Sequence, residues 1–155
     1  MNAFFRNALV YRLDPETRLD AAALDEQLAR LRTSVQSQSI GWVPSIENGQ
    51  LAHVVGGQVL LTLRAEKKLL PASVVNQFAK ARAQELEERQ GYKPGRRQLR
   101  EIKEAVTDEL IPKAFSIFRD TRLWIDPVAG WLAIDTSSPT RAEEVIGILS
   151  KSLDS

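Results

Sequence analysis

The chain has 155 residues and a mass of 17.3 kDa, which fits one domain or one domain with an appendage. Hydrophobic residues make up 43% of it and charged residues 26%, so a wholly disordered chain is excluded. The absence of cysteine excludes thiolate catalysis, cysteine-ligated zinc or iron–sulfur sites, and disulfide bonds. A formal net charge of +1 excludes a surface coated with positive charge, but this sum does not describe where the charges lie.

The first residues predict a strand rather than a signal peptide. Apolar and aromatic side chains alternate along Phe4–Leu13 with the period of a strand. Arg6 and Arg12 interrupt this run, and no small-residue cleavage site follows it. No segment is long and apolar enough to span a bilayer. We therefore expect a cytoplasmic protein.

A short helix and a loop are expected next. Asp20 is a candidate cap for a helix in which Leu24, Leu28 and Leu31 form an apolar stripe. The stretch Thr33–Gln50 is polar and is predicted to be a loop.

Two antiparallel hairpins are predicted from paired apolar runs around turn residues. The first has its arms at Leu51–Val55 and Gln58–Arg64 around Gly56-Gly57, and the second at Arg122–Asp126 and Trp131–Asp135 around Pro127–Gly130. Ser138 then caps a last amphipathic helix that begins at Pro139.

Between the hairpins, the composition predicts a pair of helices. The apolar positions of the first helix, Ala72–Gln90, are Val74, Val75, Phe78 and Leu86, and those of the second are Leu99, Ile102, Val106 and Leu110. Tyr92–Gly95 breaks the run between them, so the helices can pack antiparallel. The far end of the pair offers little apolar surface for docking, and we expect it to project from the body. Pro112 disturbs the second helix and leaves Ala114–Phe118 near its end.

These elements predict an α+β fold, with one or more antiparallel sheets packed by helices and a long projecting antiparallel helix pair. We expect three parts along the chain. Residues 1–70 form the first part of the body, residues 71–119 the projecting basic hairpin, and residues 120–155 complete the body.

Few residues are arranged for catalysis. His53, the single histidine, lies in a predicted strand, where a packed residue is more typical than a general base. Gly56-Gly57 lacks the lysine and hydroxyl residue of a phosphate-binding loop. Asp126, Asp135 and Glu143 support the hypothesis of a metal-dependent nuclease. Carboxylates at strand ends and in first helical turns are also ordinary structural features, and we favour that interpretation. No cofactor or metal is expected.

Charge is distributed unevenly. Between Arg64 and Arg122 there are 14 basic and 9 acidic residues, whereas the remaining chain has 7 basic and 11 acidic ones. The excess is greatest at the tip of the helix pair, where Glu101 is the only acidic residue among Arg89, Lys93, Arg96, Arg97, Arg100 and Lys103. Such a cluster is typical of contact with nucleic-acid phosphates, with no motif for reading bases. The alternative is a solvated helical hairpin kept soluble by its charges.

Phe115 and Phe118 are three residues apart and would share a helix face, so burial is the first expectation. If they are exposed instead, they would contact another subunit.

Several segments together resemble the bacterial recombination-associated protein RdgC family. They are Phe5–Leu13 (FRNALVYRL), Gly41–Pro44 (GWVP), Leu63–Pro71 (LRAEKKLLP), Leu110–Phe118 (LIPKAFSIF), and Ala142–Glu144 with Leu149–Leu153 (LSKSL). The order and spacing of these segments over the whole chain make the resemblance specific.

This resemblance implies a non-enzymatic protein that binds duplex DNA without sequence preference, is associated with the nucleoid, and limits RecA filament assembly. Family members form ring-like homodimers with a positively charged hole. The resemblance carries over Arg96, Arg97, Arg100 and Lys103 as DNA-binding residues, and Lys67 and Lys68 match a basic stretch of the family. Arg89 and Lys93, from the charge cluster at the tip, complete the predicted set. Phe115 matches a family motif that lies toward a dimer contact. With Phe118, its aromatic neighbour, it is the predicted oligomer interface.

Two questions stay open at this point. Gly91 and Pro94-Gly95 interrupt a segment that is continuous in the family, and members continue into a C-terminal half. The chain is therefore either a fragment or a short relative. A protein-interaction module that does not bind DNA is the main alternative function, and the nuclease is the less favoured one.

Overall fold

The computed structural model describes residues 5–14, 19–30, 32–35, 37–47 and 49–153. The chain forms two compact units. The first unit comprises Met1–Ser34, Ser39–Ala65 and Phe118–Ser155, and the second comprises Val35–Gln38 and Glu66–Ile117.

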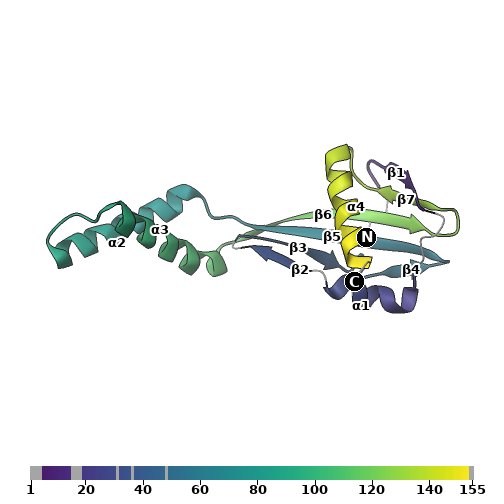
Figure 1. The fold of residues 1–155 in the computed structure, drawn as a ribbon, viewed down its shortest axis with the longest axis horizontal. Helices are drawn as coiled ribbons and strands as arrows, with labels where there is room; N and C mark the ends of the chain where they lie inside the picture. The colour runs from purple at the N-terminus through teal and green to yellow at the C-terminus, as the bar shows by residue number, and fades with distance from the viewer. Residues whose placement is uncertain (1–4, 15–18, 31, 36, 48, 154–155) are drawn as a thin grey trace. The chain divides into compact units, whose positions relative to one another are not determined.

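Seven strands form one sheet (Figure 1). Their order is β1-β7-β6-β5-β3-β2, and β4 pairs with β5 away from this path. The strands are β1 (Leu9–Arg12), β2 (Arg32–Val35), β3 (Gln38–Val43), β4 (His53–Val55), β5 (Gln58–Lys68), β6 (Ser116–Asp126) and β7 (Trp131–Ile134). The last residues of β5 and the first of β6 belong to the second unit.

Four α-helices and one 3-10 turn complete the described chain. They are α1 (Ala21–Arg30), α2 (Ala72–Gln90), α3 (Arg96–Leu110), the turn η1 (Ile111–Lys113) and α4 (Pro139–Leu153). In the first unit, α4 crosses the strands of the sheet (Figure 1). The predicted α+β class is confirmed.

The core of the first unit lies between the sheet and the helices α1 and α4. Apolar side chains that are no more than 1% exposed come from α1 (Leu24, Leu28), β5 (Leu61, Leu63), β6 (Leu123, Ile125), β7 (Ile134) and α4 (Ala142, Val145). β5 and β6 each contribute alternate residues, because successive side chains of a strand point to opposite faces. The strands therefore present one face to the helices.

Both predicted hairpins are confirmed. Gly56 and Gly57 have φ angles of +58° and +80°, which only glycine adopts readily, and they place His53 of β4 opposite Leu60 of β5. In the second hairpin, Asp126 of β6 pairs with Trp131 of β7. The cap of α4 is also confirmed, because Ser138 Oγ accepts the backbone N–H of Arg141 at 3.3 Å.

The ends of the first predicted elements differ from the structure. The strand is shorter than Phe4–Leu13, because β1 spans only Leu9–Arg12. Before it, the backbone N–H groups of Arg6 and Asn7 donate to the Asp135 carboxylate instead of to a neighbouring strand. The helix after Asp20 is confirmed as α1. Phe4 and Leu31 lie outside the described residues.

The predicted loop Thr33–Gln50 is wrong, because this stretch contains β2 and β3. Both strands lie toward one edge of the sheet, where a strand carries polar side chains more readily than at the centre. In β3, Trp42 is buried: its side chain is 6% exposed and donates its indole N–H to Ser152 Oγ at 2.9 Å.

The helical placement of Ala114–Phe118 is also wrong. The second helix of the pair ends at Leu110, η1 contains Pro112, and β6 begins at Ser116. The backbone N–H of Leu69 donates to the Phe115 carbonyl at 2.7 Å, so the chain pairs as a strand immediately after the 3-10 turn. Pro112 favours this change, since proline cannot continue an α-helix from its interior.

Both helices of the predicted pair form. That the pair projects from a body, and that the chain has three parts, stay predictions. Within the described part of the chain, no helix has the length and apolar character needed to cross a membrane.

Candidate nucleic-acid interface

The helices α2 and α3 of the second unit lie side by side (Figure 1). Their contact centres on Ala79, which is 4% exposed, and on Val106, which is fully buried. On α3, the predicted stripe is confirmed around Val106, although Leu99 near its start is 37% exposed. On α2, Phe78 was predicted to face the partner helix, but it is 45% exposed and Ala79 takes its place.

Backbone and amide hydrogen bonds define the turn between the helices. Gly91 ends α2 in the left-handed region with φ of +82°, and its N–H donates to the Glu87 carbonyl at 2.8 Å. Gly95 donates its N–H to Gln98 Oε1 at 3.1 Å, which satisfies a donor before α3 begins. Gln98 Nε2 in turn donates to Gln90 Oε1 at 3.0 Å and links the two helices. The turn thus fixes where α3 begins.

All eight predicted DNA-binding residues belong to the second unit. Seven of them have exposed side chains, and Lys68 is the half-buried exception. Its Nζ donates to the Ala114 carbonyl at 3.5 Å. Lys68 therefore serves the local structure, whereas its neighbour Lys67 is open to solvent.

Three of the eight form a row along α3, which we call the basic row: Arg96, Arg100 and Lys103. Their spacing of four and then three residues places them on one helix face. Among the described residues, none of the three forms an ion pair or a side-chain hydrogen bond. These cations therefore keep their full capacity to bind an anion.

Arg97 does not belong to the basic row. One residue further along the helix, it points about 100° away from Arg96 and forms an ion pair with Glu101 at 3.3 Å. Its side chain is 90% exposed, so this pair is weak. The sequence grouped Arg97 with the basic row by charge alone, and the structure separates them by face.

A groove runs between α2 and α3 on another face of the pair. Arg89 lines it, together with Glu85, Gln98 and Glu101. The groove also contains Arg82, which pairs with Glu109 and so ties the two helices together. Two carboxylates therefore line the groove beside its cations, and Arg82 is ion-paired, whereas the basic row has no ion pair among the described residues.

The Arg82–Glu109 pair is charged at neutral pH. The hydrogen bond and the positive charge of Arg82 lower the pKa of the Glu109 carboxyl, and Lys113 adds to the effect. Because the pKa is lower in the folded chain, the pair contributes stability at neutral pH. That contribution is lost as the pH falls through the folded pKa.

Lys80 is an exposed cation of α2 that is not among the eight predicted residues. It follows Ala79, the residue that faces α3, and helical geometry turns it about 100° to the side opposite Arg82 and Arg89. In an antiparallel pair, this side of α2 continues the side of α3 that carries the basic row. The position of Lys80 on this side follows from the contact of Ala79 with α3, which the sequence pattern did not predict.

The two phenylalanines are exposed, so the expected burial on a shared helix face is wrong. Phe115 is 86% exposed in the second unit, beside Leu69 and Ile117, which are 53% and 54% exposed. Phe118 is 54% exposed and lies in β6 of the first unit, where the Arg64 guanidinium stacks 4.7 Å from its ring centre. The two rings therefore belong to different surroundings.

Comparison with known proteins identifies the family. A family model described as "Putative exonuclease, RdgC" matches residues 3–155. The chain belongs to the RdgC family. Similar proteins from Bordetella parapertussis, Cupriavidus necator and Herminiimonas arsenicoxydans are 59%, 55% and 50% identical to it. Each is named recombination-associated protein RdgC, and each alignment covers 97% of this chain and 52% of the relative. The chain thus spans about half the length of these curated RdgC proteins.

The nuclease description of RdgC directs attention to the carboxylates. Asp126 Oδ1 accepts the N–H groups of Val128 and Ala129 at 3.1 and 3.0 Å, which closes the β6–β7 turn. Asp135 Oδ1 accepts two backbone N–H groups of the segment before β1. Glu143 is exposed on α4. No three metal-ligating side chains gather anywhere in the described ranges, so these three do not form the cluster that the nuclease hypothesis requires.

Proposed function

We propose that this RdgC chain binds duplex DNA through phosphate contacts and without reading the base sequence. The basic row carries the proposal, because its three exposed cations share one helix face and form no ion pair with any described residue. From Arg96 to Lys103 the row extends about 10 Å, at 1.5 Å per residue. Successive phosphates of one strand rise 3.4 Å along the duplex axis, so the row can reach about three of them.

The side chains of the row favour phosphates over bases. Arginine binds phosphate oxygens through paired N–H groups, and lysine binds them as a point charge. Neither contact distinguishes one base pair from another. Lys80, Lys67 and Lys93 are exposed cations of the same unit that extend the positive surface.

The proposal includes two consequences for recombination. DNA covered by this protein is closed to RecA, so occupancy limits RecA filament assembly, as the resemblance to the family implies. The protein also acts without cutting DNA. The hydrogen bonds of Asp126 and Asp135 to backbone groups support this second point.

Fluorescence anisotropy of labelled duplexes tests DNA binding. We expect two duplexes of unrelated sequence to bind equally well, and a plot of log affinity against log salt to have a slope of about −2.7 or steeper, at −0.9 for each neutralised phosphate. The DNA should stay intact when Mg²⁺ or Mn²⁺ is added. If the duplexes do not bind, the protein-interaction module is favoured. If the DNA strands are shortened after the metal is added, the nuclease is favoured.

We also propose that Phe115, with Leu69 and Ile117, contacts a second copy of the protein. The three exposed apolar side chains are neighbours, since Leu69 and Phe115 are joined by a backbone hydrogen bond. A cluster of this kind is typical of a protein contact. Phe118 contributes less in this proposal, because Arg64 covers part of its ring.

Phe115→Asp should therefore weaken self-association at least about tenfold, since burying an unpaired charge at a contact costs more than about 1.4 kcal/mol. Sedimentation velocity over a range of concentrations measures this effect. Val128→Asp is the matched control, because Val128 is 92% exposed in the β6–β7 turn of the other unit. Equal association of the two variants would contradict the assignment.

A further inference from the structure

The first unit contains a second surface feature that DNA binding does not use. It is a hollow of about 580 Å³ on the side of β1, β6 and β7 that α1 and α4 leave uncovered. Its lining includes Phe5, Val10, Tyr11, Trp124, Trp131 and Ala133. We call it the aromatic hollow.

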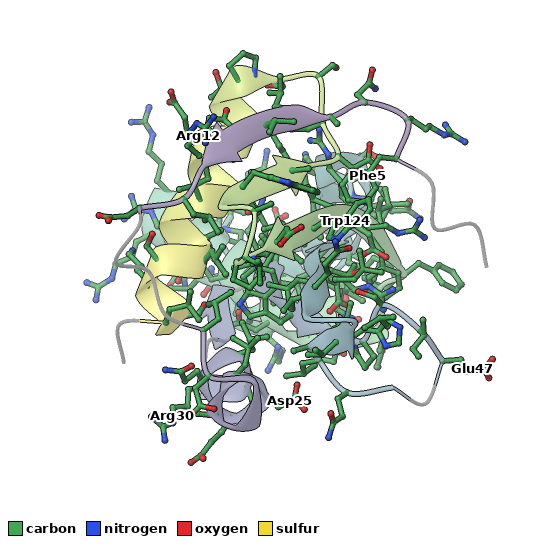
Figure 2. All side chains as sticks on the ribbon, turned by 90° about the vertical axis from the view of Figure 1, so that its right-hand side faces the viewer. Phe5, Arg12, Asp25, Arg30, Glu47 and Trp124 are labelled. Carbon is green, nitrogen blue, oxygen red and sulfur yellow. The ribbon has the colours of Figure 1, made fainter. Side chains whose placement is uncertain are left out.

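Three aromatic rings are held together at the hollow. Trp124 meets Phe5 edge-to-face with ring centres 6.5 Å apart, and it meets Trp131 in the same way at 5.4 Å. Figure 2 shows Phe5 and Trp124 next to one another. The Trp124 indole N–H donates to Gln58 Oε1 at 3.0 Å, so its polar atom is already satisfied. The surface that remains is apolar.

The sheet is apolar on both faces at this point. In β6, Leu123 and Ile125 are buried toward the helices, while Trp124 between them is 40% exposed on the opposite face. In β1, the inward residues flank Val10, which is 65% exposed. An antiparallel sheet with one solvated face normally carries polar residues there, whereas apolar residues on both faces indicate a sheet covered on both sides.

The residues that line the hollow indicate which class of molecule can bind there. Among the described residues that line the hollow, Arg12 is the only charged one, and Ala8, Ala129 and Ala133 add further apolar surface. A nucleic acid would require several cations to neutralise its phosphates. An apolar polypeptide surface fits the hollow, because large exposed apolar patches mark contacts between proteins.

We propose that the aromatic hollow is the docking site for the half of the RdgC polypeptide that this chain does not match. The chain covers 52% of its curated relatives, so each of them carries nearly as much additional polypeptide. The hollow would place that half against β1, β6 and β7 of the first unit. This docking is independent of the proposed DNA contact, whose residues lie in the second unit.

Oxidative footprinting read out by mass spectrometry tests the docking at individual residues. One sample is the chain itself, and the other is the chain joined to the unmatched half of the Bordetella parapertussis relative. We expect oxidation of Trp124 and Val10 to fall severalfold in the joined protein, while Val128 and Val55 keep their rates. Unchanged oxidation of Trp124 would overturn the proposal.

Matched variants separate docking from a general change in the fold. Val10 and Val55 are strand valines of the first unit that are 65% and 62% exposed, but only Val10 lines the hollow. In the joined protein, Val10→Asp should restore the oxidation of Trp124, whereas Val55→Asp should not. When the unmatched half is added as a separate polypeptide, it should protect Trp124 in the unmodified chain and in Val55→Asp, but not in Val10→Asp.

Two other molecules could occupy the hollow, a second copy of the chain or DNA, and each predicts a different pattern of Trp124 protection. Protection of Trp124 in the chain alone at rising protein concentration would assign the hollow to a second copy. Protection by single-stranded or duplex DNA would assign it to nucleic acid. Either result overturns the docking proposal without affecting the anisotropy test of DNA binding.

Discussion

Replacing Arg96, Arg100 and Lys103 together with glutamine should weaken duplex binding about 500-fold at 0.1 M salt, compared with the unmodified chain. This factor takes the two affinities as equal at 1 M salt, so that the difference in salt slope acts over one decade of salt concentration. Each of these side chains is expected to displace one condensed counterion from the DNA. Losing three contacts should therefore reduce the salt slope by about 2.7. Glutamine keeps the helical propensity of the positions and removes only the charge. Anisotropy titrations at several salt concentrations measure both quantities.

A second triple variant tests position against net charge. Arg89, Arg97 and Lys113 are exposed cations of the same unit, but each lies near a carboxylate. Their replacement with glutamine changes the total charge by the same amount. We expect the salt slope of this control to stay close to that of the unmodified chain. An equal loss of slope in both triple variants would show that the overall charge, and not the basic row, determines binding.

The helix pair could be predicted because a pattern of period 3.6 depends on local spacing. Leu99, Ile102 and Val106 repeat every three or four residues, and the structure places α3 accordingly. The phase of α2 could not be predicted in the same way. Its sequence offers both Phe78 and Ala79 as contact residues, and close packing of the helices selects the smaller one. The sequence therefore located the basic region but not the face on which each cation lies.

The missed strands have a different cause. Half of the residues of β2 and β3 are polar, and they are strands because they pair with other strands of the sheet. The same holds for Ala114–Phe118, where pairing of Leu69 with Phe115 overrides a helical spacing. Pairing between distant segments leaves no periodic signal in a single sequence. Trp42 is the largest residue of the predicted loop, and its burial in the core shows how such a strand is held.

Trp42→Ala should lower the free energy of unfolding by about 3–5 kcal/mol, the range for removing a large buried aromatic side chain. The Trp42 side chain is 6% exposed in the core of the first unit, so the substitution leaves a cavity there. Its indole N–H also joins β3 to α4, through Ser152 Oγ, which itself donates to the Ile148 carbonyl at 2.8 Å. Urea denaturation followed by circular dichroism measures the loss.

The hydrogen bond can be separated from the packing. Ser152→Ala leaves the buried indole N–H of Trp42 without its acceptor, which should cost about 1–3 kcal/mol. Ser150→Ala is the matched control, because Ser150 is exposed on the same helix and its loss should stay within about 0.5 kcal/mol. In a double-mutant cycle, Trp42→Phe and Ser152→Ala should show a coupling energy of about 1 kcal/mol. Additive effects would mean that Trp42 stabilises the first unit by filling space alone, and that α4 is held to β3 by packing.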